Sequence, residues 1–169
     1  RLALSDKYRE LGEQSVLISL LSKYCCLLPI SIYIEGQKSP VNDLSIPWRT
    51  TGNVNNIRKR KQVLAFARHF ETNFEPLYAF EIPRNERLGV EGVLWIQAGT
   101  GFETSDFRNV SVFVRNMHIT SDGRDLLPNW AGFVGCTLST VSLTPTASRE
   151  DLQKDATYHA IKAYLEQCL

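Results

Sequence analysis

Apolar residues recur along the chain with two different periods, and each period predicts one kind of secondary structure. Helical spacing, with apolar side chains returning every three or four positions, covers residues 4–28, 55–71 and 148–168. Alternating stretches, or stretches rich in β-branched and aromatic residues, predict strands at 30–35, 77–82, 92–97, 110–120 and 136–143. A short helix is expected at 125–134.

The breaks between these stretches indicate the fold class. Pro29 ends the first helix, residues 36–47 are typical of a polar loop, and glycines at 99 and 101 mark a second loop. Helices on both sides of a run of strands predict an α/β or α+β fold. We expect one domain over residues 1–169, with a mainly antiparallel or mixed sheet flanked by helices, opening and closing on long helices.

Composition restricts the function classes. The apolar fraction is 43% with three tryptophans, enough for a packed core. The net charge of +1 provides no global attraction to nucleic acid or membrane. The longest apolar run begins at Cys25 and is far shorter than the roughly 20 residues that span a bilayer. Without a signal-peptide pattern, we expect a cytoplasmic protein with no nucleic-acid or membrane partner.

Residue types that carry chemistry are scattered. The cysteines have no paired metal-ligand spacing, and the histidines have no partner cysteine nearby, so we expect no metal site and reduced thiols. The chain has no nucleophile-elbow or phosphate-loop motif. The basic run at 58–61 would point to all sides of a helix, which favours a solvated face over a nucleic-acid patch.

Arg149 is the most informative single residue. Ser148 is a good N-cap and Asp151 completes a capping-box pattern, so a helix is expected to begin there. A cation in the first turn is disfavoured by about 0.3–1 kcal/mol. Arg149 therefore either forms a surface ion pair, for example with Glu150, or helps the helix end to bind an anion such as a phosphate.

Two aromatic residues lie in predicted loops. Trp48 follows a polar stretch and Phe102 follows Gly101. Aromatic side chains on loops can form contact surfaces for protein partners, although tryptophan is more often packed inside. Both interpretations stay open.

Two segments resemble the middle domain of the heat-shock protein 90 (HtpG-type) chaperones. Residues 112–130 read VFVRNMHITSDGRDLLPNW, and residues 143–153 read LTPTASREDLQ. Looser similarity at 29–33, 46–49 and 91–96 extends the resemblance over nearly the whole chain. The resemblance implies the larger lobe of that middle domain, with the N-terminal ATP-binding and C-terminal dimerisation domains outside this chain.

The resemblance also implies a function. In that family the N-terminal domain binds ATP with magnesium, and a middle-domain arginine reaches the γ-phosphate. By position this is Arg149, assisted by Gln153 on the same helix face, with Arg115 supporting the same region. The implied partners are the protein's own ATPase domain, unfolded clients at Trp48 and Phe102, and a second copy in the parent homodimer. The fragment alone is not expected to hydrolyse ATP.

Departures from the family pattern leave an alternative. Asn116 stands where the family strand has a second arginine, His118 replaces an aromatic residue, and the stretch before Arg149 lacks the family's acids. A catalytically silent protein-interaction module therefore stays an alternative. An independent enzyme is disfavoured because the chain lacks an acid–base or metal constellation.

Overall fold

The structure is a computed structural model that describes residues 5–50, 55–98 and 108–169, without the side chains of residues 6 and 9. The chain folds as two compact units, Arg1–Leu44 and Ser45–Leu169. No helix in the described ranges is long and apolar enough to cross a membrane.

The first unit holds a 3-10 helix, η1 (Asp6–Gly12), and the helix α1 (Gln14–Tyr24). The predicted continuous helix over 4–28 is therefore wrong at both ends. Tyr8 departs from helical geometry and Glu13 is extended, with ψ of 134°. At the other end, the residue before Pro29 is disfavoured in the helical region, and the helix ends at Tyr24.

The predicted strand at 30–35 is also wrong, since the described residues there form no strand. The side chain of Asn42 takes the backbone bonds that a neighbouring strand would have made. Its Oδ1 accepts from the Ile32 amide at 2.8 Å, and its Nδ2 donates to the Ile30 carbonyl at 2.9 Å. An alternating pattern forms a strand only when a second strand pairs with it.

The second unit contains a five-stranded mixed sheet in the order β1-β2-β5-β3-β4, antiparallel except for the parallel β3–β5 pair. Its strands are β1 (Pro76–Glu81), β2 (Val90–Gln97), β3 (Val110–Val114), β4 (Met117–Thr120) and β5 (Val134–Thr140). The single strand predicted at 110–120 is a hairpin. Arg115 and Asn116, with φ of 51° and 66°, form its two-residue turn.

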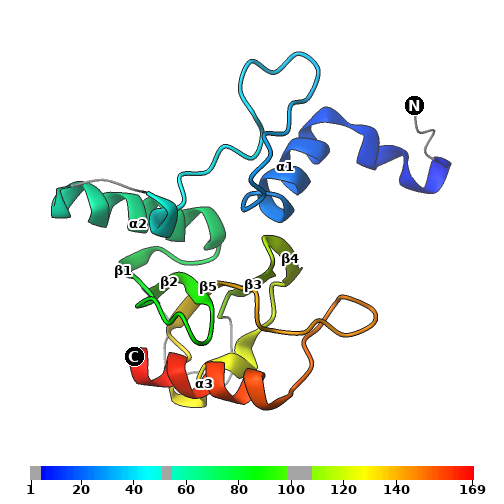
Figure 1. Cartoon of the computed structure of the whole chain (residues 1–169). Coiled ribbons are helices and arrows are strands. Elements are labelled where there is room, and N and C mark those ends of the chain that lie inside the picture. The colour runs from blue at the N-terminus through cyan, green and yellow to red at the C-terminus, as the bar shows by residue number, and fades with distance from the viewer. Residues whose placement is uncertain (1–4, 51–54, 99–107) are drawn as a thin grey trace. The chain divides into compact units, whose positions relative to one another are not determined.

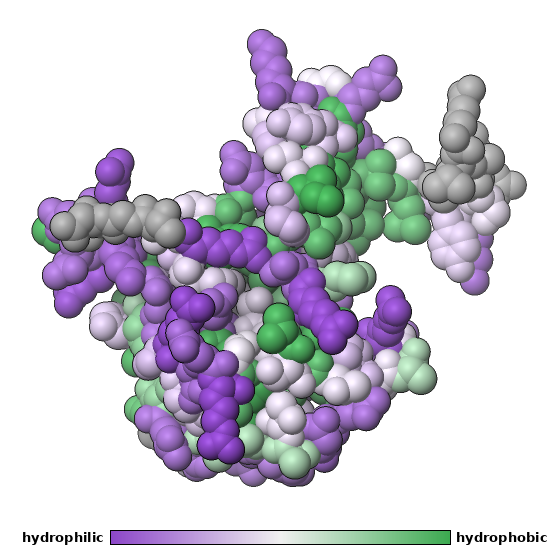
Figure 2. Space-filling model, viewed as in Figure 1, coloured by the Kyte–Doolittle hydropathy of each residue, from purple (hydrophilic) through white to green (hydrophobic). Residues whose placement is uncertain are grey.

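Two helices cover opposite faces of this sheet (Figure 1). On one face lies α2 (Asn56–Phe70), close to the predicted 55–71, where the Phe70 ring packs edge-on against Phe113 with centroids 5.9 Å apart. Residues 58–61 of this helix are exposed, and Figure 2 shows hydrophilic side chains crowding this end. The predicted solvated helix face is confirmed.

The opposite face packs against α3 (Ala156–Cys168). Its core is a buried apolar cluster of strand residues such as Leu94, Val112 and Leu138 together with Ile161 and Leu165 of α3. Strand residues thus alternate between the two helices, as period-two spacing requires. The layered α+β class predicted from the sequence is confirmed.

Two predicted helices differ from the structure. Residues 125–134 form two 3-10 turns, η3 (Arg124–Leu126) and η4 (Asn129–Ala131), because Pro128 lies between them and cannot continue a helix. The last helix begins at Ala156 rather than Ser148. Asp155 caps it by accepting from the Tyr158 amide at 2.8 Å.

Candidate functional site

The segment between β5 and α3 forms a braced loop rather than the start of a helix. An antiparallel bridge joins Pro145 to Leu152. Flanking this bridge, the Thr146 amide donates to the Asp151 carbonyl and the Gln153 amide donates to the Thr144 carbonyl, both at 2.8 Å. The Leu152 side chain is buried in the core cluster, so the stem of the loop is anchored while residues 147–150 are exposed at its tip.

Arg149 lies at this tip in the left-handed backbone region, with φ of 59°. That conformation costs a residue with a side chain about 1–2 kcal/mol. It is held here by the Arg149 amide, which donates to the Thr146 carbonyl at 3.0 Å. The exposed guanidinium makes no hydrogen bond or ion pair with any described residue. The loop therefore exposes the planar Arg149 guanidinium to solvent, with its N–H donors unpaired by any described residue.

Gln153 and Ser148 do not have the geometry that the helical interpretation implied. Residues 148–153 are not helical, so Arg149 and Gln153 do not share a helix face. The Gln153 carboxamide instead donates to the Pro145 carbonyl at 3.2 Å, and the Ser148 hydroxyl bonds with that of Thr146 at 3.1 Å. The capping pattern was misleading because Asp155, seven residues later, caps the helix.

Arg115 is exposed in the β3–β4 turn, at the sheet end from which the Arg149 loop departs. Its amide donates to the carbonyl of Thr140, the last residue of β5, at 2.9 Å. The neighbouring Asn116 side chain accepts from Arg49 at 2.5 Å. Arg115 and the Arg149 loop are therefore both attached to the end of β5.

Trp48, in the 3-10 helix η2 (Pro47–Arg49), is half-buried rather than displayed on a loop. Its ring packs edge-on against Phe66 of α2 with centroids 5.1 Å apart. The indole Nε1 is buried, and among the described residues it has no hydrogen-bond partner. Phe102, the other predicted contact residue, lies outside the described residues.

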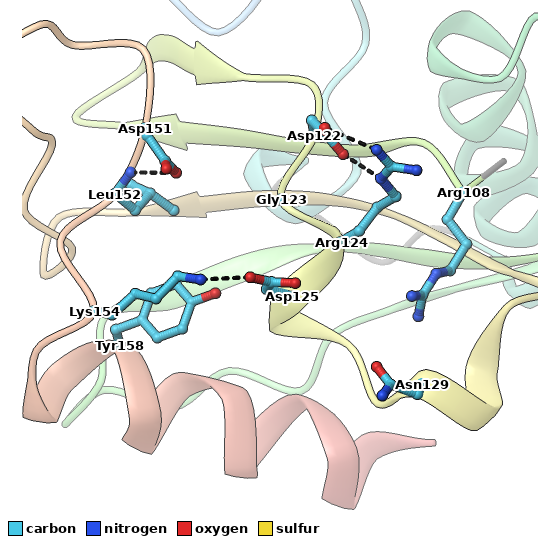
Figure 3. Close-up of a pocket in the computed structure, with 10 residues that line it drawn as sticks. All are labelled: Arg108, Asp122, Gly123, Arg124, Asp125, Asn129, Asp151, Leu152, Lys154 and Tyr158. Atoms are coloured by element: carbon cyan, nitrogen blue, oxygen red, sulfur yellow. Dashed lines mark hydrogen bonds and ion pairs between the residues drawn. The ribbon is translucent and has the colours of Figure 1, made fainter. Parts of the chain in front are cut away.

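A polar hollow of about 360 Å³, which no sequence pattern predicted, is lined in part by Asp151 and Leu152 at the base of the Arg149 loop (Figure 3). It is lined by Arg108, Asp122, Gly123, Arg124, Asp125, Asn129, Asp151, Leu152, Lys154 and Tyr158. The sequence signal available was Asp122-Gly-Arg, which is typical of an ordinary turn.

Two ion pairs lie among the charged residues that line this hollow. Arg124 holds both carboxylate oxygens of Asp122, and Lys154 Nζ lies 2.5 Å from Asp125 Oδ2. The hydrogen bond from Lys154, followed by its charge, lowers the pKa of Asp125. Arg108 is buried and donates to the Pro128 carbonyl at 2.9 Å. The Lys154–Asp125 pair thus links η3 to the residues that follow the Arg149 loop.

The described residues contain no group of three or more His, Cys, Asp or Glu side chains arranged to hold a metal. The four cysteines are free thiols, and burial raises the pKa of Cys136.

Comparison with known proteins points to one chaperone. No protein-family model matches the chain. Among similar curated proteins are Chaperone protein HtpG of Chlorobium luteolum, 21% identical, and Chaperone protein HtpG of Chlorobaculum tepidum, 22% identical, each over 169 residues. Each match covers 96% of this chain and 26% of the relative, so the chain spans about a quarter of the length of the curated relatives it matches. Along nearly all its residues, the chain is similar to one region of HtpG.

Proposed function

We propose that this chain is the middle, coupling domain of an ATP-dependent chaperone of the HtpG type. In the full-length protein, an N-terminal domain holds ATP with magnesium, and Arg149 is presented to the γ-phosphate. The observation that carries this proposal is the exposed Arg149 guanidinium, which makes no ion pair with the described residues and stands on a braced loop.

The physical basis is the action of a cation supplied from a second domain. Negative charge on the transferred phosphoryl group is stabilised by a guanidinium, and hydrolysis then depends on domain closure. The braced loop matters because a side chain on a flexible loop would lose more conformational entropy when it contacts the phosphate. Gln153 contributes by tying the loop to the Pro145 carbonyl, and Arg115 adds positive charge at the same end of the sheet.

Protein partners follow from the same similarity. Unfolded or partly folded clients contact the surface near Trp48 and Phe102, and the parent protein acts as a cytoplasmic homodimer. Trp48 is half-buried against Phe66 of α2, so the residue is partly accessible to a client there. These assignments rest on the similarity to HtpG and on aromatic contact chemistry.

Substitution of Arg149 in the full-length protein tests the proposed role of this residue in ATP hydrolysis. Arg149→Ala should lower the ATP turnover number by about tenfold or more while ATP binding is retained, because the lost interaction forms mainly in the transition state. Arg149→Lys should recover only part of the rate, since an ammonium lacks the planar fork. Turnover is measured by phosphate release and ATP binding by calorimetry.

Arg87→Ala is the matched control, because Arg87 is also exposed and makes no ion pair with the described residues. It should leave turnover unchanged. Equal turnover in wild type and Arg149→Ala, with ATP bound in both, would reject the catalytic role. That result would favour a silent protein-interaction module.

A further inference from the structure

The N-terminal end of α2 carries charge of the unfavourable sign. A helix N-terminus is positive and favours acids, yet the first turn of α2 has no acidic residue. Four cations, Arg58, Lys59, Arg60 and Lys61, follow one another there. Such crowding raises the local positive potential although the whole chain is nearly neutral.

The structure separates these four cations by direction. Lys59 Nζ lies 3.2 Å from Glu81 Oε1, so its charge is matched. Arg58 and Lys61, three positions apart, share one side of the helix and line a hollow of about 450 Å³. Neither makes an ion pair with a described residue, and Arg60 is not among the residues lining this hollow.

The other lining residues are Ser45, Thr50 and Gln62, all uncharged. Gln62 Nε2 donates to Ser45 Oγ at 2.7 Å and to Thr50 Oγ1 at 2.6 Å. The Thr50 hydroxyl in turn donates to the Ile46 carbonyl at 3.2 Å. Ser45 therefore keeps its own hydroxyl hydrogen as a donor beside the two cations.

Absence of carboxylates distinguishes this hollow from two others in the same unit. Asp122, Asp125 and Asp151 line the hollow of Figure 3, and Glu81 and Glu91 line one of about 230 Å³ beside Trp48. Among the described residues that line the α2 hollow, every charge is positive. Two cations with a hydroxyl donor and no competing acid match a doubly charged oxyanion.

We propose that the hollow formed by Ser45, Thr50, Arg58, Lys61 and Gln62 binds a phosphate group. Arg58 and Lys61 contact its oxygens, and the Ser45 hydroxyl adds a third donor. Gln62 is a positioning residue, because it holds both hydroxyl side chains at the rim. The phosphate is either free or carried on a phosphorylated peptide segment, and the two sources share this chemistry.

Titration of the full-length protein at fixed ionic strength tests the site. Inorganic phosphate, a short phosphoserine peptide and its unphosphorylated form are added in separate calorimetric experiments. Wild type should bind phosphate or the phosphoserine peptide saturably, and Arg58→Gln and Lys61→Gln should each weaken that binding about tenfold. The unphosphorylated peptide should bind far more weakly. A clear preference for the phosphopeptide identifies the peptide-borne source, and equal affinity identifies free phosphate.

Arg60→Gln is the matched control, since it removes the same charge from the same helix outside the hollow. It should change affinity less than about twofold, because an exposed charge that does not line the hollow is screened by salt. Equal weakening by Arg58→Gln and Arg60→Gln, or no saturable binding in wild type, would overturn the proposal. This site shares no residue with the Arg149 loop, so the two proposals fail independently.

Discussion

Pro145 and Leu152 are paired across the base of the loop that carries Arg149. The Leu152 side chain continues from this bridge into the core beneath α3 and is 4% exposed. The loop that carries the guanidinium is therefore anchored in the core through Leu152, and Leu143 on the other side of the loop is buried in the same cluster.

Truncation of Leu152 should loosen this coupling. Leu152→Ala removes a buried side chain and should lower the free energy of unfolding by roughly 2–5 kcal/mol, measured by urea denaturation. Leu77→Ala, at an exposed position of β1, should change it by less than about 0.5 kcal/mol. Equal effects of the two substitutions would show that Leu152 does not anchor the loop.

Because the Arg149 backbone is left-handed, glycine and alanine at this position should differ in stability although both lose the guanidinium. Arg149→Gly removes the steric cost of a side chain at φ of 59°, although glycine raises the entropy of the unfolded chain. We expect Arg149→Gly to be more stable than Arg149→Ala by roughly 0.5–1 kcal/mol in urea denaturation. Both variants should lose the proposed ATPase stimulation. An Ala variant as stable as the Gly variant would argue against the left-handed conformation.

The Asp125–Lys154 pair should make stability depend on pH. The hydrogen bond and charge of Lys154 lower the pKa of Asp125 in the folded protein. The stabilisation is therefore present above the ordinary aspartate pKa of about 4, and it is lost as pH falls through the lower folded value. Because both side chains are largely exposed, 55% for Lys154 and 68% for Asp125, the effect should be small.

Comparison of Asp125→Asn with wild type by urea denaturation at stepped pH measures this effect. The variant should be less stable near neutral pH, and the difference should vanish in acid. Glu150→Gln serves as the control, because its exposed carboxylate has no ion-pair partner among the described residues. A difference that persists unchanged into acid would contradict the assignment.

Glu71, at the end of α2, is a buried carboxylate that accepts from two buried donors. Its Oε2 accepts from Trp95 Nε1 at 3.3 Å and from Gln97 Nε2. Glu71→Ala would leave both donors unpaired and should cost roughly 2–5 kcal/mol of unfolding free energy. Glu75→Ala, which breaks the exposed pair with Arg68, should cost less than about 1 kcal/mol. The Trp95 indole proton in an NMR spectrum should shift only in the Glu71 variant.

Local pattern was sufficient for several elements of the second unit, whereas the β3–β4 hairpin, the two 3-10 turns and the start of α3 differed from the prediction. The helix α2 and the strands β1, β2 and β5 lie close to their predicted positions, because each buries an apolar stripe or an alternating face against a neighbour. Close packing of one strand residue against another adds a constraint that the hydrophobic pattern does not contain. A Cβ on Gly135 would overlap the Trp95 indole, so this strand position requires glycine.

The sequence by itself therefore determined the layered α+β class and the approximate position of most strands. It singled out Arg149 on the premise of a helix beginning at Ser148, whereas the helix is capped by Asp155. Only the tertiary structure decided that residues 30–35 lack a strand partner, that 148–153 form a braced loop, and that Arg58 and Lys61 share a hollow without Lys59. Periodicity reports which side of an element is buried. Pairing, capping and charge matching depend instead on residues distant in sequence, as Asn42, Leu152 and Glu81 show here.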